Sequence, residues 1–166
     1  MTNTSHKNFE QLVESYFFHS FTEDQKNAMD VFMRFFVSEK QFCLYILQGF
    51  AGTGKSSLVA AIVKSLQKIK MKTRLLAPTG RAAKVLSNFA KIPAYTIHKQ
   101  IYFSGNELST QKPTLAKNLF ENTLFFVDEA SMIGISDKNN DTNLLEDLLN
   151  YVYHGKNCRL IFMGDS

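Results

Sequence analysis

The chain has 166 residues, of which 45% are hydrophobic and 20% are charged. This length suits one domain, the composition excludes a largely disordered chain, and no uncharged apolar run approaches the roughly 18 residues of a transmembrane helix. The net charge of +4 is compatible with a nucleic-acid partner without establishing one. Residues 1–10 are polar and lack an apolar signal core, so we expect a cytoplasmic location.

Two helices are predicted before residue 40. Residues 1–8 are expected to be loose, and apolar residues at helical spacing indicate a short helix over 9–18. Thr22 and Gln25 have the spacing of a capping box, with Thr at the cap and Gln three residues later. The second helix should follow this box and end near Ser38.

The next segment carries the sequence's strongest motif. Residues 42–47 are continuously apolar, as in a strand covered on both faces, and a helical apolar pattern follows from Leu58. Between them, residues 49–56 read Gly-Phe-Ala-Gly-Thr-Gly-Lys-Ser and fit the phosphate-binding loop. A glycine-rich turn with a chance Lys-Ser is the alternative, but the strand and helix on either side favour the loop.

The chemistry of this loop is phosphate binding. Glycines let backbone N–H groups close around a phosphate, and the following helix adds its positive N-terminal end. Lys55 supplies charge toward the β- and γ-phosphates, and the Ser56 hydroxyl can ligate Mg²⁺. We therefore expect ATP and Mg²⁺ as cofactors. The expected nucleotide-binding residues within the loop are Gly49, Ala51, Gly52, Thr53, Gly54, Lys55, Ser56 and Ser57.

Further strands and helices alternate along the rest of the chain. Strands are predicted over 73–77, 124–127 and 159–163, and helices after Gly80 and over 144–152. Residues 96–122 read as a less regular region, and 136–143 as a polar loop. This alternation predicts an α/β fold, with a central parallel sheet between two layers of helices. Cys43 and Cys158 lie in or beside apolar strands, and buried reduced thiols are the expected outcome.

The predicted strands end in chemically distinctive residues. Ligands of such sheets bind beyond the carboxyl ends of the strands, and Gly49, Pro78, Asp128 and Gly164 all lie there. Asp128 can hold Mg²⁺, and the adjacent Glu129 can orient or deprotonate an attacking water. A solvated acidic pair is the alternative, weakened by the phosphate-binding loop upstream.

The ordered motifs resemble those of superfamily 1B DNA helicases of the RecD/Dda type. The resemblance covers residues 22–166 and implies a RecA-like domain that binds Mg-ATP and single-stranded DNA, moving 5′ to 3′ in the whole protein. It rests on the phosphate-binding loop and on the segments Ala77–Lys84, Thr96–His98, Val127–Ile133 and Phe162–Asp165.

The resemblance also implies roles for single residues. Gln25 matches the glutamine that reads adenine, with helix capping as its alternative role. Lys55 and Glu129 would be catalytic, Ser56 and Asp128 would bind the metal, and Asp165 would couple the nucleotide to DNA. This resemblance also makes the chain, residues 1–166, a single ATP-binding domain with an N-terminal extension over 1–20.

Single-stranded DNA is the partner that the resemblance implies. Pro78, Thr79, Arg81 and His98 match its DNA-contacting segments. Hydroxyl and N–H groups there can bind phosphate oxygens, and His98 can stack on a base. A structural role for His98 remains open, as does a solvated helix face for Lys84. Residues 100–121 correspond to a small accessory insertion, either a β-hairpin near Tyr102 and Phe103 or an ordinary loop.

The resemblance further leads us to expect the first motor domain of a larger helicase. Relatives continue into a second RecA-like domain that supplies an arginine finger, typically worth about 10³–10⁵ in rate. This chain alone should therefore bind nucleotide without efficient turnover, and the sheet edge at 42–48 should be bare. The alternatives are another phosphate-loop ATPase, such as a loader or kinase, and a module that only binds nucleotide or DNA.

Overall fold

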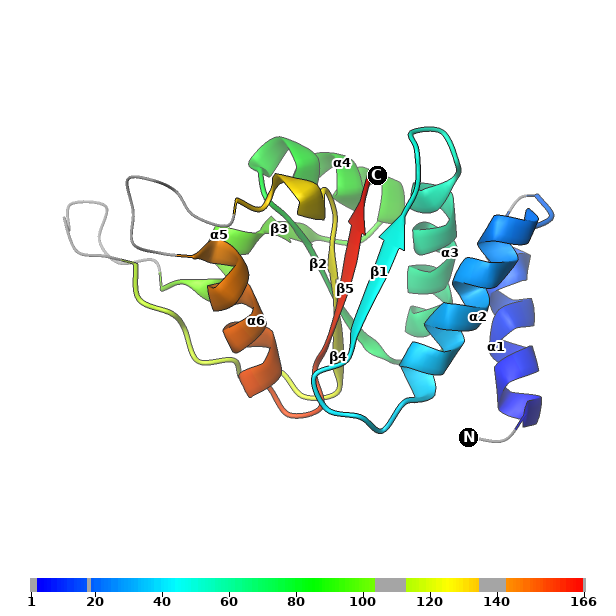
Figure 1. The fold of residues 1–166 in the computed structure, drawn as a ribbon, viewed down its shortest axis with the longest axis horizontal. Helices are drawn as coiled ribbons and strands as arrows, with labels where there is room; N and C mark the ends of the chain where they lie inside the picture. Colours follow the sequence, from blue (N-terminus) through cyan, green and yellow to red (C-terminus); the bar gives the residue numbers. More distant parts are fainter. Residues whose placement is uncertain (1–2, 18, 104–112, 135–142, 166) are drawn as a thin grey trace.

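The protein is a three-layer α/β domain built on a central parallel sheet (Figure 1). The computed structural model describes residues 3–17, 19–103, 113–134 and 143–165. Within these ranges five strands pair in parallel in the order β1-β5-β4-β2-β3. They are β1 (Leu44–Gln48), β2 (Lys72–Ala77), β3 (Ala94–Thr96), β4 (Thr123–Val127) and β5 (Arg159–Gly164). The predicted fold class is confirmed.

Helices cover both faces of the sheet. On one face pack α1 (Asn3–Tyr16), α2 (Glu23–Val37), α3 (Lys55–Lys68) and α4 (Gly80–Ala90). The other face carries α5 (Ile97–Ile101) and α6 (Leu144–His154), and a 3₁₀ turn over Ala130–Met132 follows β4. Each face buries its own apolar cluster, with Phe32 and Phe126 in one and Phe125 and Leu148 in the other. None of the helices in the described ranges is long and apolar enough to cross a membrane.

The predicted boundaries hold at most elements and fail at three: the N-terminal helix, the unpredicted strand β3 and α5. The capping box forms: the Thr22 hydroxyl accepts a bond from the Gln25 N–H, and α2 ends at Val37. The N-terminal helix, however, spans 3–16 rather than 9–18, so residues 3–8 are helical. Residues 97–101, predicted to be irregular, form α5 because the Thr96 hydroxyl caps its first turn at the Lys99 N–H.

Strand β1 lies at one edge of the sheet, as the bare edge predicted at 42–48 requires. The expectation that this strand is covered on both faces is wrong. Tyr45 and Leu47 are buried against α2, whereas Leu44 and Ile46 are 39% and 54% exposed. An edge strand has a neighbour on one side only, and α6 packs against β5 rather than β1.

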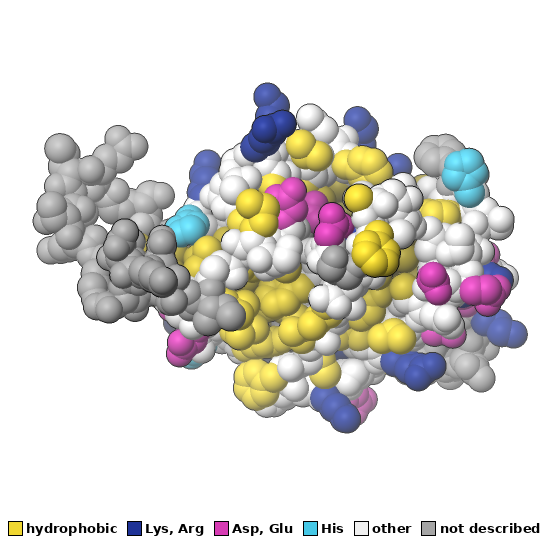
Figure 2. Space-filling view, turned by 45° about the horizontal axis from the view of Figure 1, so that its top comes forward, with side chains coloured by type: hydrophobic (Ala, Val, Ile, Leu, Met, Phe, Trp, Pro, Cys, Tyr) yellow, Lys and Arg dark blue, Asp and Glu magenta, His cyan; other side chains and the backbone are white. Residues whose placement is uncertain are grey.

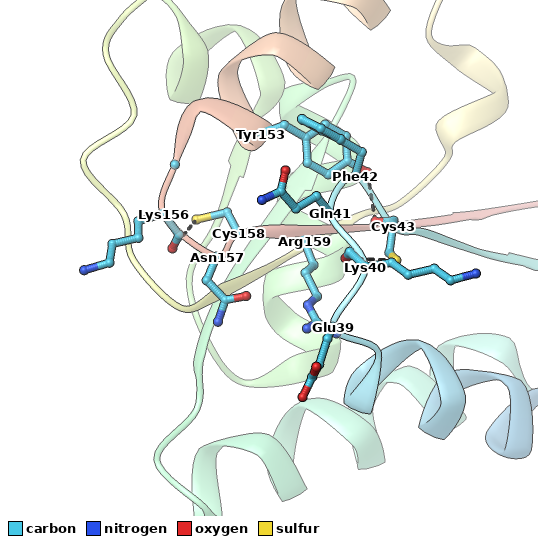
Figure 3. Close-up of a pocket in the computed structure, with 11 residues that line it drawn as sticks. Glu39, Lys40, Gln41, Phe42, Cys43, Tyr153, Lys156, Asn157, Cys158 and Arg159 are labelled. Atoms are coloured by element: carbon cyan, nitrogen blue, oxygen red, sulfur yellow. Dashed lines mark hydrogen bonds between the residues drawn. The ribbon is translucent and has the colours of Figure 1, made fainter. Parts of the chain in front are cut away.

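The two cysteines lie near the opposite, amino-terminal edge of the sheet and are free thiols, as predicted, but only Cys158 is buried, whereas Cys43 is half-buried (Figure 3). Their sulfur atoms point away from each other: the Cys43 thiol donates to the Lys40 carbonyl, and the Cys158 thiol donates to the Phe120 carbonyl. Burial raises the pKa of the Cys158 thiol. Arg159 extends beside them to the carbonyl oxygens of Phe35, Phe36 and Ser38, which closes the C-terminal end of α2.

Candidate nucleotide-binding site

The phosphate-binding loop connects β1 to α3 at the carboxyl edge of the sheet, at the top of Figure 1. Gly52 and Gly54 have φ angles of +82° and +83°, a region that L side chains rarely adopt. Gly54 is also the N-cap of α3 and offers no side-chain acceptor to the first N–H groups of the helix. These N–H groups, which lie beside the exposed Ser56 and Ser57, can therefore bind an anion such as a phosphate.

Lys55 occupies the centre of the site. Its Nζ donates to the Gly49 and Phe50 carbonyl oxygens at 2.5 and 2.8 Å, and to Asp165 Oδ1 at 2.7 Å. The Lys55 side chain is 16% exposed, whereas that of Asp165 is 65% exposed. The structure thus brings together two predicted site residues that are 110 positions apart in the sequence.

Asp128 directly follows β4, and the charges of Lys55 and Asp165 both influence its carboxyl group. Burial raises the pKa of the Asp128 carboxyl group, opposed by a hydrogen bond from the Glu129 N–H, while Asp165 raises it further and Lys55 lowers it. That N–H lies 3.0 Å from Asp128 Oδ1. Asp128 and the Ser56 hydroxyl provide the oxygen ligands that Mg²⁺ prefers, so the donor set fits Mg²⁺ beside a phosphate.

Glu129 is held in an unusual backbone conformation. Its φ and ψ angles are +51° and +40°, the left-handed region that non-glycine residues seldom adopt. The 3₁₀ turn that follows packs against the end of β5, where Gly164 faces the Ser131 N–H. A strained residue at a strand end is typical of a functional site, because the surrounding packing must hold it in place.

Gln25 touches the loop while it caps α2. Its Oε1 accepts a bond from the Thr22 N–H at 3.0 Å, and its Nε2 donates to the Thr53 carbonyl at 3.0 Å. A glutamine amide has two donor hydrogens and two acceptor lone pairs, so one of each remains. The capping role is therefore present, and it leaves the amide able to bind one further donor and one further acceptor.

The residues predicted to contact DNA fall into two places. Thr79 and Arg81, at the start of α4, line a cavity of about 390 Å³ together with Asp128 and Glu129. The Thr79 hydroxyl also caps α4 by accepting a bond from the Ala82 N–H. Pro78 precedes this cap directly. His98 lies apart from the cavity, exposed on α5, with its ring 5.7 Å from that of Tyr102.

Two exposed apolar residues of this region are absent from the sequence prediction. Val85 and Met132 are 61% and 58% exposed and line the same cavity as Glu129. Val85 belongs to the apolar pattern of α4, and its exposure follows from its helix face, which periodicity alone does not orient. Met132 lies in the segment after Asp128, where no periodic signal exists.

The carboxyl edge differs in charge from its surroundings. Figure 2 turns this edge toward the viewer and shows acidic side chains in its middle, with Lys and Arg side chains along its upper margin. The cavity of about 410 Å³ in Figure 3, near Cys43 and Arg159, contains none of the predicted site residues. The candidate site is therefore at the carboxyl edge.

Three features together define a RecA-like P-loop NTPase domain. They are a glycine loop between a parallel strand and a helix, a lysine within that loop, and an aspartate directly after a buried strand. The family model described as "AAA domain" matches residues 20–166. The chain belongs to this family, as a first RecA-like domain of the RecD/Dda type of superfamily 1B.

Two relatives place the chain within the family. It is 33% identical over 157 residues to the ATP-dependent DNA helicase dda of Enterobacteria phage T4, with 90% of this chain and 32% of the relative covered. It is 30% identical over 123 residues to the ATP-dependent RecD2 DNA helicase of Deinococcus radiodurans, with 74% of this chain and 15% of the relative covered. The chain thus spans a third or less of the length of these relatives.

Proposed function

We propose that this chain is the ATP-binding motor domain of a DNA helicase that moves 5′ to 3′ on single-stranded DNA. One observation carries the proposal: Lys55 pairs with Asp165 at the phosphate-binding loop, both charges influence the carboxyl group of Asp128, and Asp128 shares a cavity with Thr79 and Arg81. Nucleotide and nucleic acid would therefore bind at neighbouring positions on one edge of the sheet.

The residues divide the nucleotide chemistry among themselves. The loop N–H groups and Lys55 would hold the phosphates, and Ser56 and Asp128 would hold Mg²⁺. When bound, Mg-ATP supplies the phosphoanhydride bond whose cleavage drives the motor. Glu129, adjacent to Asp128 and lining the shared cavity, would accept a proton from the attacking water. The remaining donor and acceptor of Gln25 match the edge of an adenine ring.

The DNA side depends on α4. Its first N–H groups and the Thr79 hydroxyl can bind a backbone phosphate, and Arg81 and Lys84 are exposed cations on the same helix. Asp165, which contacts Lys55, is placed to communicate between the nucleotide and the rest of the motor. His98 would contact DNA farther along, from α5.

The accessory insertion over 100–121 is part of this proposal. Tyr102 and Leu115 form an antiparallel bridge, and the Phe103 N–H donates to the Thr114 carbonyl at 3.0 Å. This pairing is compatible with the base of a hairpin. The remainder of such a hairpin, residues 104–112, lies outside the described residues. A second RecA-like domain in the whole protein would complete the ATPase site.

The proposal is tested by binding measurements on this chain. A fluorescent ATP analogue should bind in the presence of Mg²⁺, and Lys55→Ala should weaken binding at least about tenfold. Lys68→Ala, which removes an exposed lysine from the far end of α3, should leave binding unchanged. Equal binding by Lys55→Ala would contradict the site assignment.

DNA binding separates the helicase from the other nucleotide-binding proteins. Fluorescence anisotropy with labelled oligo-dT should show binding that weakens with salt, and Arg81→Ala should weaken it while ATP binding persists. ATP binding without any salt-sensitive DNA binding would instead favour a loader or a small-molecule kinase. Catalysis in the whole protein should stop with Glu129→Gln while Mg-ATP still binds.

A further inference from the structure

A large cavity at the carboxyl edge lies between the end of α1, the phosphate-binding loop and the end of α4. Its volume is about 820 Å³, within the range of pockets that enclose small molecules. Aromatic rings line it from two sides: Tyr16 at the end of α1 and Phe17 directly after it, and Phe89 on α4. Asn88 and Gln25 add amide groups. The lining also includes His19, Lys64 and Lys91. Aromatic walls with a few polar side chains suit a flat heterocyclic base.

The cavity lies where a nucleoside would leave the phosphate-binding loop. Its lining includes Gly52, Gly54 and Ser57, whereas Gly49, Phe50 and Lys55 line an adjoining cavity of about 480 Å³. Thr22, Gln25 and Thr53 line both cavities. In a phosphate-binding loop the lysine reaches the β- and γ-phosphates, and the loop N–H groups cradle the α- and β-phosphates. The sugar and base, which follow the α-phosphate, are thereby directed into the larger cavity.

We propose that this cavity holds the base and ribose of the bound nucleotide, and that the N-terminal helix α1 forms its outer wall through Phe17. The inference rests on the proposed function and extends it, because the family match begins at residue 20 and leaves α1 outside. The N-terminal helix is then part of the nucleotide site rather than an accessory to the fold.

The packing of α1 makes this wall rigid. The Phe9 ring stacks on Phe32 at 6.3 Å and on Phe36 at 5.5 Å, so α1 is fixed to α2. Val13 is fully buried, and α1 also packs along α3, the helix that carries the phosphate-binding loop. The Phe17 ring lies 4.8 Å from that of Phe21, which fixes the chain as it leaves α1. A preorganised aromatic ring loses little freedom when a base packs against it.

The test compares two ligands that differ in the nucleoside. Titration calorimetry would measure binding of Mg-ATP and of inorganic tripolyphosphate, which has the phosphates without base or ribose. Phe17→Ala should weaken ATP binding about tenfold, as expected for a lost stacking surface, and leave tripolyphosphate binding unchanged. Lys55→Ala should weaken both ligands. Phe42→Ala, which removes a 69% exposed aromatic ring near the opposite edge, serves as the matched control.

The outcomes separate the two proposals. If the unmodified chain binds neither ligand, the proposed function fails; if it binds ATP and Phe17→Ala binds it equally well, only the role of α1 is overturned. Thermal unfolding monitors the fold of each variant. Should Phe17→Ala unfold, Phe17→Leu keeps apolar packing without an aromatic face and decides the question. If Phe17→Leu folds and binds ATP as tightly as the unmodified chain, then Phe17 does not form a wall of the nucleoside site.

Discussion

At the scale of single residues, the ion pair between Lys55 and Asp165 means that Asp165 and a bound phosphate compete for the Lys55 ammonium group. An ammonium group has three donor hydrogens, and Lys55 directs them to two loop carbonyls and to Asp165. A phosphate that binds Lys55 must therefore displace at least one of these partners. Asp165 is the partner that carries a negative charge, so it both competes with a phosphate and repels it.

Replacing Asp165 by Asn should therefore tighten nucleotide binding. An exposed ion pair contributes about 0.2–1 kcal/mol, which corresponds to as much as about fivefold in Kd for ADP. Calorimetry on Asp165→Asn measures the change. Asp24→Asn, which removes a charge from the neighbouring cavity, controls for the general loss of negative charge. Weaker ADP binding by Asp165→Asn would mean that this carboxylate supports the nucleotide directly.

The raised pKa of Asp128 predicts how the stability of the domain depends on pH. Burial raises its pKa, so the folded protein binds this proton more tightly than the unfolded chain. The stabilising contribution is complete at pH values below the pKa of the unfolded chain, and is lost as the pH rises through the higher folded value. At neutral pH the carboxylate is ionised and half-buried, which opposes folding.

Asp128→Asn should consequently raise the midpoint of thermal unfolding at pH 7 in Mg²⁺-free buffer. The gain should shrink as the pH falls, because the native carboxyl group is then neutral as well. Melting curves between pH 4 and pH 7.5 measure both trends. The same variant should lose Mg²⁺-dependent ATP binding. A lower melting point at pH 7 would show that hydrogen bonds to this carboxylate outweigh its burial.

At the scale of elements, α3 ends in a motif that glycine would suit better. Lys70 has a φ angle of +60°, its N–H donates to the Gln67 carbonyl, and the Met71 N–H donates to the Leu66 carbonyl. These two bonds define a Schellman motif with Lys70 in the left-handed position. A lysine side chain there crowds its own backbone, a conflict that glycine avoids.

Lys70→Gly should stabilise the domain by about 1 kcal/mol, which is about 2–4 °C in Tm for a domain of this size. Lys70 is exposed and lies at the end of α3 away from the phosphate-binding loop, so nucleotide binding should not change. Lys68→Gly, inside the last turn of the same helix, should instead destabilise by up to about 1 kcal/mol. The critical result is that the two glycine substitutions change the melting temperature in opposite directions.

The long elements could be predicted from the sequence because their local signals agree. Glycine and proline mark their ends, and the Thr22–Gln25 capping box fixed the start of α2. Strand β3 has only three residues, too few to show a period, and α5 depends on a single cap at Thr96. Both were missed for that reason.

The sequence indicates a candidate site residue only where a local motif contains that residue. The shared position of Gly49, Asp128 and Gly164 follows from strand ends, which share one edge in a parallel sheet, whereas Asp165 was indicated by the family resemblance. Contacts between distant segments left no local pattern. The Arg74 guanidinium lies 4.8 Å from the ring centres of both Tyr95 and Phe120, an arrangement that no spacing within β2 indicates. The cavity between Phe17 and Phe89 belongs to the same class.

At the scale of the whole molecule, the β1 edge stands out. Its sheet neighbour on the inner side is β5, and within the described residues its other side has no strand. Leu44 and Ile46 project from β1 onto a face that α6 leaves open, and Figure 2 shows a broad hydrophobic area below the carboxyl edge. Unpaired backbone groups beside exposed apolar side chains can pair with a strand from another molecule.

This chain should therefore self-associate through β1 as its concentration rises. Ile46→Lys places a charge on the 54% exposed position and should shift light-scattering profiles toward monomer, with the melting temperature little changed. Leu119→Lys is the matched control, since it removes a 79% exposed apolar side chain that lies outside every strand of the sheet. If both variants reduce association equally, general hydrophobicity rather than the strand edge is responsible. If neither does, the edge is protected in solution.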